Sequence, residues 1–454
     1  MLLQYVLFVL ASMTLVVGWE TELGIQLQGR KLSTTYLWVA MILVTIGLSG
    51  RSEISVFVRW FSSCAPLLSF ILAAVPFVVL RRCYFVLDEV FTSEHDDMED
   101  VLVIACQHLL GTQLMMFRLL LWMGLKAENL VVIGKNYSSN ATVCQKLRRL
   151  GCVLAPFSQS FANDQGFDGW FCEHTSRFIE RELASRDLSR FRKIIILDDG
   201  GLLHECISRL SLDWDKVTGI EQTSSGWHRL QRSSMPFQWH SIARHDYKLR
   251  DEAVVVGRLC AERIEQHLRR RGKRDPLVLI MGLGAIGQQT ACAMVNKGYR
   301  VVCTDIKSVP GDALAEPIKQ SSTFLEYQEA MARLQDFEVI VGAAGEQVIT
   351  PDLINHLHPG VSLLSISSSD REFPAVAFRT DPAGLVHSDY YLGARCLVNG
   401  GFPVTFYGNR HELAPRQIQM TIAMLALMLL AVSSGKSQVI PEELNRLWRK
   451  HQIA

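Results

Sequence analysis

Long apolar runs set the first 80 residues apart from the rest of the chain. Residues 2–19, 32–50 and 60–80 carry no charged side chain. Each run is close to the roughly 20 residues that a helix needs to cross ~30 Å of hydrocarbon. We expect transmembrane helices at 2–19 and 32–50. The third run stays open between a span and a helix of the following domain, because Pro66 and Pro76 interrupt it.

The flanking charges suggest an orientation for this N-terminal region, 1–80. Four arginines lie on its C-terminal side, at positions 51, 59, 81 and 82. Under the positive-inside rule this places the main body of the protein in the cytoplasm, associated with the membrane. The alternative is that all three runs are buried helices of a soluble cytoplasmic protein. Residues 417–435 are equally free of charge, yet we expect them to form a packed core helix.

Beyond residue 98, short apolar segments alternate with helical ones. Strands are predicted at 101–105, 130–134, 151–155 and from 193 into the glycine pair at 200–201, with helices at 107–123 and 141–150. This alternation is typical of a doubly wound parallel sheet, here over 98–245. Ligands of such sheets bind beyond the carboxyl ends of the strands, which makes His108, Asp198, Asp199 and residues 221–223 candidates.

A second α/β domain is predicted over 250–395. A helix at 251–271 leads into an apolar strand at 277–281, the glycine motif 282–287, a helix to 298 and a strand at 300–305. A G-x-G-x-x-G motif between a strand and a helix, with an acid about 20 residues on, is the dinucleotide fingerprint. The predicted cofactor-binding residues of this motif are Gly282, Gly284, Ala285, Ile286 and Gly287.

Each part of this motif has a physical role toward a dinucleotide. Gly282 permits a tight turn, Gly284 lets the backbone approach a pyrophosphate, and Gly287 allows close packing of helix on strand. Asp305 is placed to accept hydrogen bonds from the ribose hydroxyls. Because its carboxylate repels a 2′-phosphate, the predicted cofactor is NAD rather than NADP, a preference that Lys307 weakens slightly.

Composition narrows the classes of partner. The 46 Lys and Arg against 45 Asp and Glu leave a net charge of +1, which argues against a nucleic-acid partner. The 11 cysteines are scattered and form no C-x-x-C pair, so the sequence predicts no metal site and a reducing compartment.

Several motifs, in order, resemble those of the S-adenosylhomocysteine hydrolase family. They are Ala105-Cys-Gln-His108, Ile196-Leu-Asp-Asp-Gly-Gly201, Gly219-Ile-Glu-Gln-Thr-Ser-Ser-Gly226, the glycine motif and Leu397-Val-Asn399. The resemblance covers roughly 101–447. It implies two doubly wound parallel-sheet domains, a substrate domain and a Rossmann NAD domain, with 396–454 returning to the substrate domain. It also implies a homo-oligomer and a nucleoside-like ligand.

The resemblance further implies roles for individual residues. In the family, tightly held NAD oxidises the 3′-hydroxyl of the substrate ribose, a base removes the C4′ proton, and the thiolate leaves. His108 resembles the acid or base near the leaving group, and Asp199 resembles the catalytic carboxylate. Thr223, Ser224 and Ser225 resemble the hydroxyl row that binds NAD, and Asn399 the asparagine near the nicotinamide.

The chain also departs from the family pattern. The second glutamate of the E-E-T-T-T motif is Gln222, and the family's glycine-histidine pair is Ser367-Ser368. The lysine motif expected between 235 and 252 is missing, which leaves Lys248 as the available lysine. Three functions therefore stay open: a hydrolase-like enzyme using His108, Asp199 and Lys248, a decayed membrane-tethered NAD- or nucleoside-binding protein, and an NAD-dependent reductase.

Overall fold

A computed structural model describes Val86, Val90 and residues 97–307, 316–321, 323–379, 385–409, 411–437 and 440–452. The chain divides into two units between residues 89 and 90, and the account below concerns residues 90–454. The apolar runs at 2–19, 32–50 and 60–80 lie outside the described residues. The membrane helices expected there therefore stay predictions.

The first sheet has six parallel strands in the order β3-β2-β1-β4-β5-β6. These strands are β1 (Val101–Gln107), β2 (Leu130–Gly134), β3 (Val153–Leu154), β4 (Lys193–Asp198), β5 (Val217–Glu221) and β6 (Gln238–Ser241). Successive strands are added outward from β1 on one side and then from β4 on the other. The point where the order reverses lies between β1 and β4, and ligands of open α/β sheets bind outside it.

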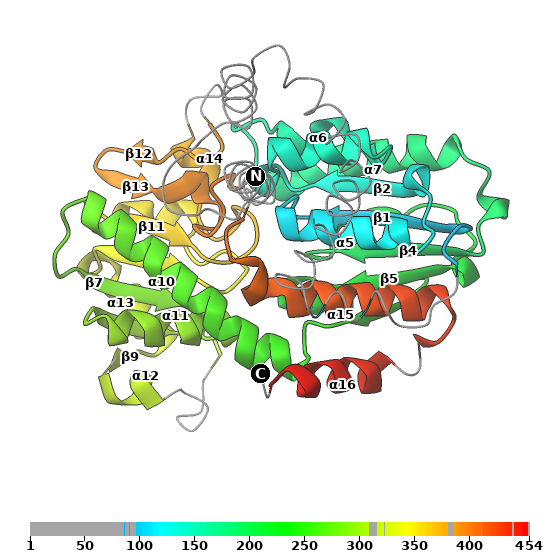
Figure 1. Cartoon of the computed structure of the whole chain (residues 1–454). Coiled ribbons are helices and arrows are strands. Elements are labelled where there is room, and N and C mark those ends of the chain that lie inside the picture. Colours follow the sequence, from blue (N-terminus) through cyan, green and yellow to red (C-terminus); the bar gives the residue numbers. More distant parts are fainter. Residues whose placement is uncertain are drawn as a thin grey trace, which may run out of the picture. The chain divides into compact units, whose positions relative to one another are not determined.

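Helices cover both faces of this sheet. Leu102 and Ile104 of β1 pack with Phe171 of α7 (Phe167–Ala184) and Leu203 of α8 (Leu202–Ile207) on one face. Helices α5 (Gly111–Trp122) and α15 (Pro415–Ser433) pack against each other, and α15 also contacts β4 and β5 (Figure 1). Apolar side chains on both faces of β1 are what a parallel sheet covered on both sides requires.

The second sheet repeats this order for its first five strands and adds the last two at one edge. Its strands are β7 (Leu277–Met281), β8 (Arg300–Thr304), β9 (Thr323–Phe324), β10 (Val339–Gly342), β11 (Ser362–Ser365), β12 (Tyr390–Leu392) and β13 (Arg395–Leu397). They lie in the order β12-β13-β11-β10-β7-β8-β9, and only the β12–β13 pair among the described strands is antiparallel. Helix α10 (Ala253–Arg270) packs on α11 (Ala285–Asn296). The predicted fold class, two doubly wound parallel sheets, is confirmed.

Helix α15 comes from the C-terminal part of the chain but belongs to the core of the first sheet. Among the described residues it is the one helix long and apolar enough to cross a membrane, and 72% of its apolar window is buried. Its contacts with α5, β4 and β5 account for that burial. A buried core helix explains the charge-free run at 417–435 without a bilayer. Helix α16 (Ile440–Gln452) follows it.

Several predicted boundaries are wrong for identifiable reasons. The helix expected from residue 107 begins at Gly111, because Gln107 still pairs with Gly134 in the sheet. The helix expected from 251 is preceded by a π-helical turn at Tyr247–Glu252. The expected strand at 151–155 is reduced to Val153–Leu154. Strand β6 carries the polar sequence Gln-Trp-His-Ser, so no apolar run marked it.

Candidate functional site

Three ionisable side chains meet at the reversal point of the first sheet. His108 follows β1, Asp199 follows β4, and Lys135 follows β2. The Lys135 ammonium lies 2.5 Å from Asp199 Oδ1, and His108 Nε2 lies 3.4 Å from the same oxygen. The His108 side chain is 13% exposed, against 4% for Lys135 and 2% for Asp199, so a ligand would reach the imidazole first. These three residues form the candidate acid–base group.

Burial and mutual charge set the protonation of this group. Burial lowers the pKa of His108 and outweighs the opposing effect of Asp199, which favours the neutral imidazole. Burial alone would raise the pKa of Asp199, but Lys135 and His108 hold it well below its usual range. Burial likewise opposes the charge on Lys135, yet Asp199 keeps its pKa above the usual range. The group therefore holds an ion pair, Lys135 with Asp199, whose carboxylate also faces a neutral imidazole.

A local turn places Asp199 at this point. Gly200 and Gly201 adopt φ angles of 112° and 81°, in the left-handed region that favours glycine, and they begin helix α8. Asp198 Oδ1 accepts the Asp199 N–H at 2.8 Å, and its Oδ2 accepts the His204 N–H at 3.0 Å. The Asp-Asp-Gly-Gly segment therefore directs the Asp199 carboxylate toward Lys135 and His108 and the Asp198 carboxylate toward His204.

Aromatic rings from the late part of the chain cover the imidazole. Phe406 stacks on His108 with centroids 4.3 Å apart, and Phe402 stacks on Tyr137 at 4.7 Å. Asn399, with φ 52°, holds this loop because its amide donates to the carbonyls of Phe402, Pro403 and Phe406. The amide hydrogens of Asn399 thus bind backbone carbonyls within its own loop. These contacts fix the loop, and the predicted role of Asn399 near the nicotinamide stays a prediction.

The glycine loop of the second sheet lies at the equivalent reversal point, between β7 and β10. Gly282 has φ 109°, and a Cβ there would lie 2.7 Å from the backbone of Ala343. A Cβ on Gly287 would lie 2.0 Å from the Gly282 carbonyl oxygen. By contrast, a Cβ on Gly284 would meet nothing within 4 Å. Two glycines are needed for packing, and the third leaves open space at the start of α11.

The predicted acidic residue closes this loop. Asp305 Oδ2 accepts the Leu283 N–H at 2.6 Å, and its Oδ1 accepts the Lys307 N–H at 2.9 Å. Each oxygen keeps a lone pair for a further donor. Next to it Ile306 is 75% exposed, and Ile286 at the start of α11 is 37% exposed. We call the carboxyl-terminal edge of this sheet, from the glycine loop to Asp305, the crest. It offers an anchored carboxylate, helix N–H groups without intrahelical partners and apolar surface.

One arginine connects the crest to the first sheet. Arg371 Nη1 donates to Ser225 Oγ at 3.3 Å and to the Gly345 carbonyl at 3.4 Å, while its Nη2 lies 3.0 Å from Asp168. Glu372 supports the same loop by accepting the N–H groups of Ala344 and Gly345. The loop after β10 is thereby fixed opposite the start of α9 (Ser224–Arg232).

The predicted residues occupy distinct places. Thr223 caps α9 by accepting the Gly226 N–H, Ser224 is exposed, and Ser225 faces the loop after β10 through Arg371. Lys248 pairs with Glu252, which also bonds Thr421, and no contact joins it to His108 or Asp199 within the described structure. The family's lysine position in 235–252 therefore supplies no ammonium to the acid–base group.

Lys135 is a functional candidate that no sequence motif marks. It directly follows β2, so the carboxyl-end rule that selects His108 and Asp199 could have selected it as well. The family resemblance points instead to a lysine within 235–252, which is why Lys135 was not predicted. Lys135 is 3% exposed, and its ammonium is paired with Asp199.

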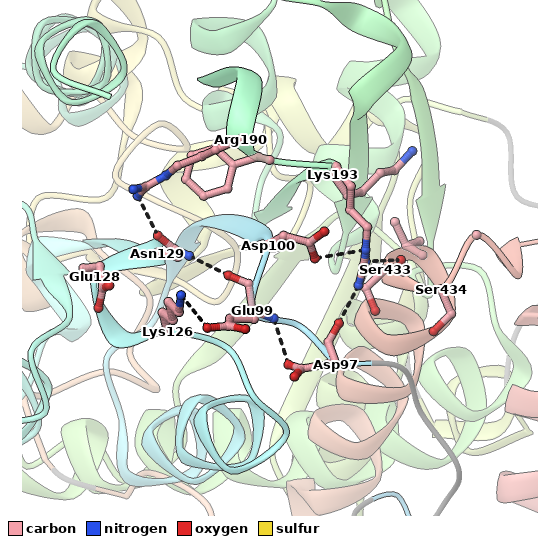
Figure 2. Close-up of a pocket in the computed structure, with 14 residues that line it drawn as sticks. Asp97, Glu99, Asp100, Lys126, Glu128, Asn129, Arg190, Lys193, Ser433 and Ser434 are labelled. Carbon is pink, nitrogen blue, oxygen red and sulfur yellow. Dashed lines mark hydrogen bonds and ion pairs between the residues drawn. The ribbon is translucent and has the colours of Figure 1, made fainter. Parts of the chain in front are cut away.

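A cavity of about 980 Å³ lies at the opposite, amino-terminal edge of the first sheet (Figure 2). Its lining is mostly charged, and two of its cations pair with acidic side chains of the same lining. Lys126 lies 2.5 Å from Glu99, and Arg192 lies 3.1 Å from Asp100. It is remote from the carboxyl ends of the strands, where α/β sheets bind their ligands.

The fold and the site define a two-sheet α/β protein with a dinucleotide-type glycine loop and a buried acid–base group. The chain belongs to the family of two Mycobacterium tuberculosis proteins, the uncharacterized protein MT0113 of strain CDC 1551 and the uncharacterized protein Rv0104 of strain H37Rv. It is 32% identical to each over 355 residues, which is 76% of this chain and 67% of the relative. No established protein-family profile matches it.

Comparison with solved structures gives weak likenesses. A dipicolinate synthase chain of Bacillus halodurans superposes with a TM-score of 0.41 and 14% identity, covering 74% of this chain and 99% of that one. The transhydrogenase of Sinorhizobium meliloti gives 0.36 and 11%, covering 76% and 97%. Likenesses below a TM-score of 0.5 decide neither fold nor activity, so the fold assignment rests on the strand orders above.

Proposed function

We propose that this protein is an enzyme that binds NAD and oxidises a sugar hydroxyl of a nucleoside-like ligand. The observation that carries the proposal is that each of the two sheets bears a different functional feature at the point where its strand order reverses. One bears an open glycine loop with an anchored carboxylate, and the other bears a buried acid–base group. The resemblance to S-adenosylhomocysteine hydrolases supplies the ligand class, and the geometry supports the division of labour between the two sheets.

The residues of the crest fit a dinucleotide. A Cβ on Gly284 would meet nothing within 4 Å, so space is open at this position. Gly284 directly precedes α11, and the N-terminus of a helix, with its first N–H groups, favours an anion. Asp305, held by Leu283 and Lys307, would accept the ribose hydroxyls. Bound NAD would supply a hydride acceptor.

The acid–base group suits proton transfer at a hydroxyl. When the carbon–hydrogen bond of an alcohol breaks and the hydride leaves, the hydroxyl proton must pass to a base. His108 is the candidate because burial keeps it neutral and it is the most exposed of the three. Its Nε2 faces Asp199, so the proton would reach Nδ1 through the Ser138 hydroxyl, which would take the substrate proton as it passes its own to the ring. Asp199 faces the imidazole and would stabilise the imidazolium, while Ser138 Oγ lies 2.5 Å from the other ring nitrogen.

Lys135 would act as a fixed positive charge beside the reacting oxygen. Its ammonium is oriented by Asp199, so the pair stays net neutral while offering remaining N–H donors. In the family pattern an ammonium is expected from the segment 235–252, where Lys248 is bound to Glu252 instead. We infer that the ammonium of this site comes from the residue that follows β2.

A second candidate is a reductase that uses the same group in reverse, protonating a carbonyl oxygen from His108. It is favoured by the residues that depart from the hydrolase pattern. Gln222 stands where the family has a second titrating glutamate, and Ser367-Ser368 stands where it has glycine-histidine. A carbonyl reduction needs the acid–base group and the cofactor but not these additional groups.

The test is the absorbance of reduced nicotinamide in purified full-length protein. We expect adenosine or S-adenosylhomocysteine to produce this band, whereas 3′-deoxyadenosine, which lacks the hydroxyl, gives none. His108→Gln should abolish the change while bound cofactor is retained. Turnover of added NADH with carbonyl compounds alone supports the reductase. Bound NAD that no nucleoside or carbonyl compound alters supports a binding protein without catalysis.

A further inference from the structure

Three buried side chains that the proposed reaction does not use meet behind the acid–base group. Asp198 ends β4, His204 lies in α8, and Glu221 ends β5, and all three side chains are 0% exposed. His204 Nδ1 lies 3.0 Å from Asp198 Oδ2 and 3.7 Å from Glu221 Oε2. One potential ligand atom of each residue lies within 4.8 Å of the other two.

One carboxylate oxygen in this cluster has no hydrogen-bond partner. Glu221 Oε1 accepts the Gly200 N–H at 3.1 Å, the Thr223 N–H at 2.7 Å and the Thr223 hydroxyl at 2.8 Å. Its Oε2 is buried and without a hydrogen-bond partner among the described residues, and it faces His204 Nδ1. A buried carboxylate oxygen left unpaired in this way is costly, so something else should satisfy it.

With Asp198, Asp199 and Glu221 all ionised, the charges in this region would not balance within the described structure. Asp198, Asp199 and Glu221 are all buried, and Lys135 is paired with Asp199. Two carboxylates are thus left with only an imidazole between them. Burying a carboxylate costs several kcal/mol unless a cation compensates it. A divalent cation would neutralise both at once.

We propose that Asp198, His204 and Glu221 bind a divalent transition-metal ion, with zinc as the best match. Zinc is held by imidazole nitrogen and carboxylate oxygen at about 2.0–2.2 Å, which puts tetrahedral ligand atoms roughly 3.4 Å apart. The observed 3.0 Å and 3.7 Å lie on either side of that spacing. Asp198 Oδ2 accepts the backbone N–H of His204 and also forms a hydrogen bond with His204 Nδ1 at 3.0 Å. Metal binding would displace the proton between these two atoms, so that the second lone pair of Oδ2 and the lone pair of Nδ1 would both turn to the ion.

The ion would tie together the carboxyl ends of β4 and β5 and the start of α8. It would lie one residue from Asp199 and so stabilise the turn that carries this carboxylate. Because such sites form only in the folded chain, metal binding adds directly to the stability of the fold. The proposal is independent of the nicotinamide reaction. It involves positions 198, 204 and 221, whose spacing matches no sequence motif for metal binding.

The test is the metal content of full-length protein produced with zinc in the medium and dialysed against metal-free buffer. We expect about one zinc per chain, lost in Glu221→Gln and His204→Asn and retained in His267→Asn. His267 is the matched control, because it is another buried histidine, bonded to Ser362 in the second sheet. A chelator should lower the unfolding temperature of the wild type but not of His204→Asn.

X-ray absorption of the wild type distinguishes zinc bound at this site from zinc bound by any of the 11 cysteines. It tests the proposal even where a variant fails to fold. A first shell of nitrogen and oxygen ligands, including one imidazole, supports the proposal. Sulfur ligands, a metal-free wild type or full zinc content in both variants would overturn it.

Discussion

The ammonium of Lys135 lies 2.5 Å from Asp199 Oδ1, although the strands that precede them, β2 and β4, are separated by β1. Both side chains are nearly inaccessible to solvent. The pair thus spans the reversal point of the first sheet directly beside His108. Such a buried pair has consequences for stability as well as for catalysis.

Lys135→Met should destabilise the protein by about 3 kcal/mol, because it leaves Asp199 as an uncompensated buried charge. The double variant Lys135→Met/Asp199→Asn should recover much of that loss, since both charges are gone. Denaturant unfolding measures both. The control is Lys126→Met, which removes an exposed pair with Glu99 at the same 2.5 Å distance and should cost much less, because solvent screens that pair. Equal losses in the two single variants would contradict the assignment.

A valine should have very different effects on stability at two glycines of the glycine loop. Gly287→Val should cost about 3 kcal/mol, because its Cβ would lie 2.0 Å from the Gly282 carbonyl oxygen. Gly284→Val should change the free energy of unfolding by no more than about 0.5 kcal/mol, since its Cβ meets nothing within 4 Å. Thermal or denaturant unfolding distinguishes them. A large loss at Gly284 would show that this position is packed rather than open.

Stability should fall in acid partly through His267. Burial lowers the pKa of His267 to about 4, with Asp389 opposing the shift and Arg270, Arg271 and Lys273 adding to it. The unfolded imidazole titrates near 6.5, so between about 6.5 and about 4 the unfolded state binds more protons. Stability contributed by the neutral imidazole is therefore present above this range and is lost as the pH falls through it.

The loss attributable to His267 amounts to about 3 kcal/mol across that range. It is measured as the difference between the pH dependences of unfolding of the wild type and of His267→Asn. The variant should have the shallower slope between the two pH values. Identical slopes would mean that the folded protein does not disfavour protonation of this histidine.

The N-terminal runs predict that the full-length protein resists extraction from membranes. Residues 2–19 and 32–50 are long and apolar enough to span as helices. Carbonate extraction should therefore leave the protein in the membrane fraction. Its appearance in the soluble fraction would mean that these runs pack as core helices, as α15 does.

Sequence patterns identified the two sheets because most central strands of parallel sheets are continuous apolar runs, as in β1, β4 and β7. The glycine motif located the turn after β7, because its spacing is typical of the turn between a strand and a helix. Short or polar edge strands such as β6 and β12 lack that signal. Their position is decided by the neighbouring strand rather than by their own residues.

The candidate site was only partly predictable. His108 and Asp199 follow apolar strands and match motif positions, so local rules found them. Lys135, Asp198 and Glu221 also lie at or directly after the ends of strands, so the same rule covers their positions, but their contacts with Asp199 and His204 depend on which strands become neighbours. Asn399 matched a motif, yet its amide hydrogens bind three backbone carbonyls of its own loop. Such partners are visible only once the chain is folded.

The most direct test of the central claim is the dinucleotide content of purified protein, measured by mass spectrometry after denaturation and by calorimetric titration with NAD. We predict that the wild type releases or binds about one NAD per chain. Gly284→Val, which fills the open space on the crest, and Asp305→Ala should bind much less while remaining folded. Gly169→Ala, another glycine with nothing within 4 Å of its Cβ, is the control and should bind NAD normally. A wild type that binds no NAD, or a Gly284→Val variant that binds it equally well, would contradict the account.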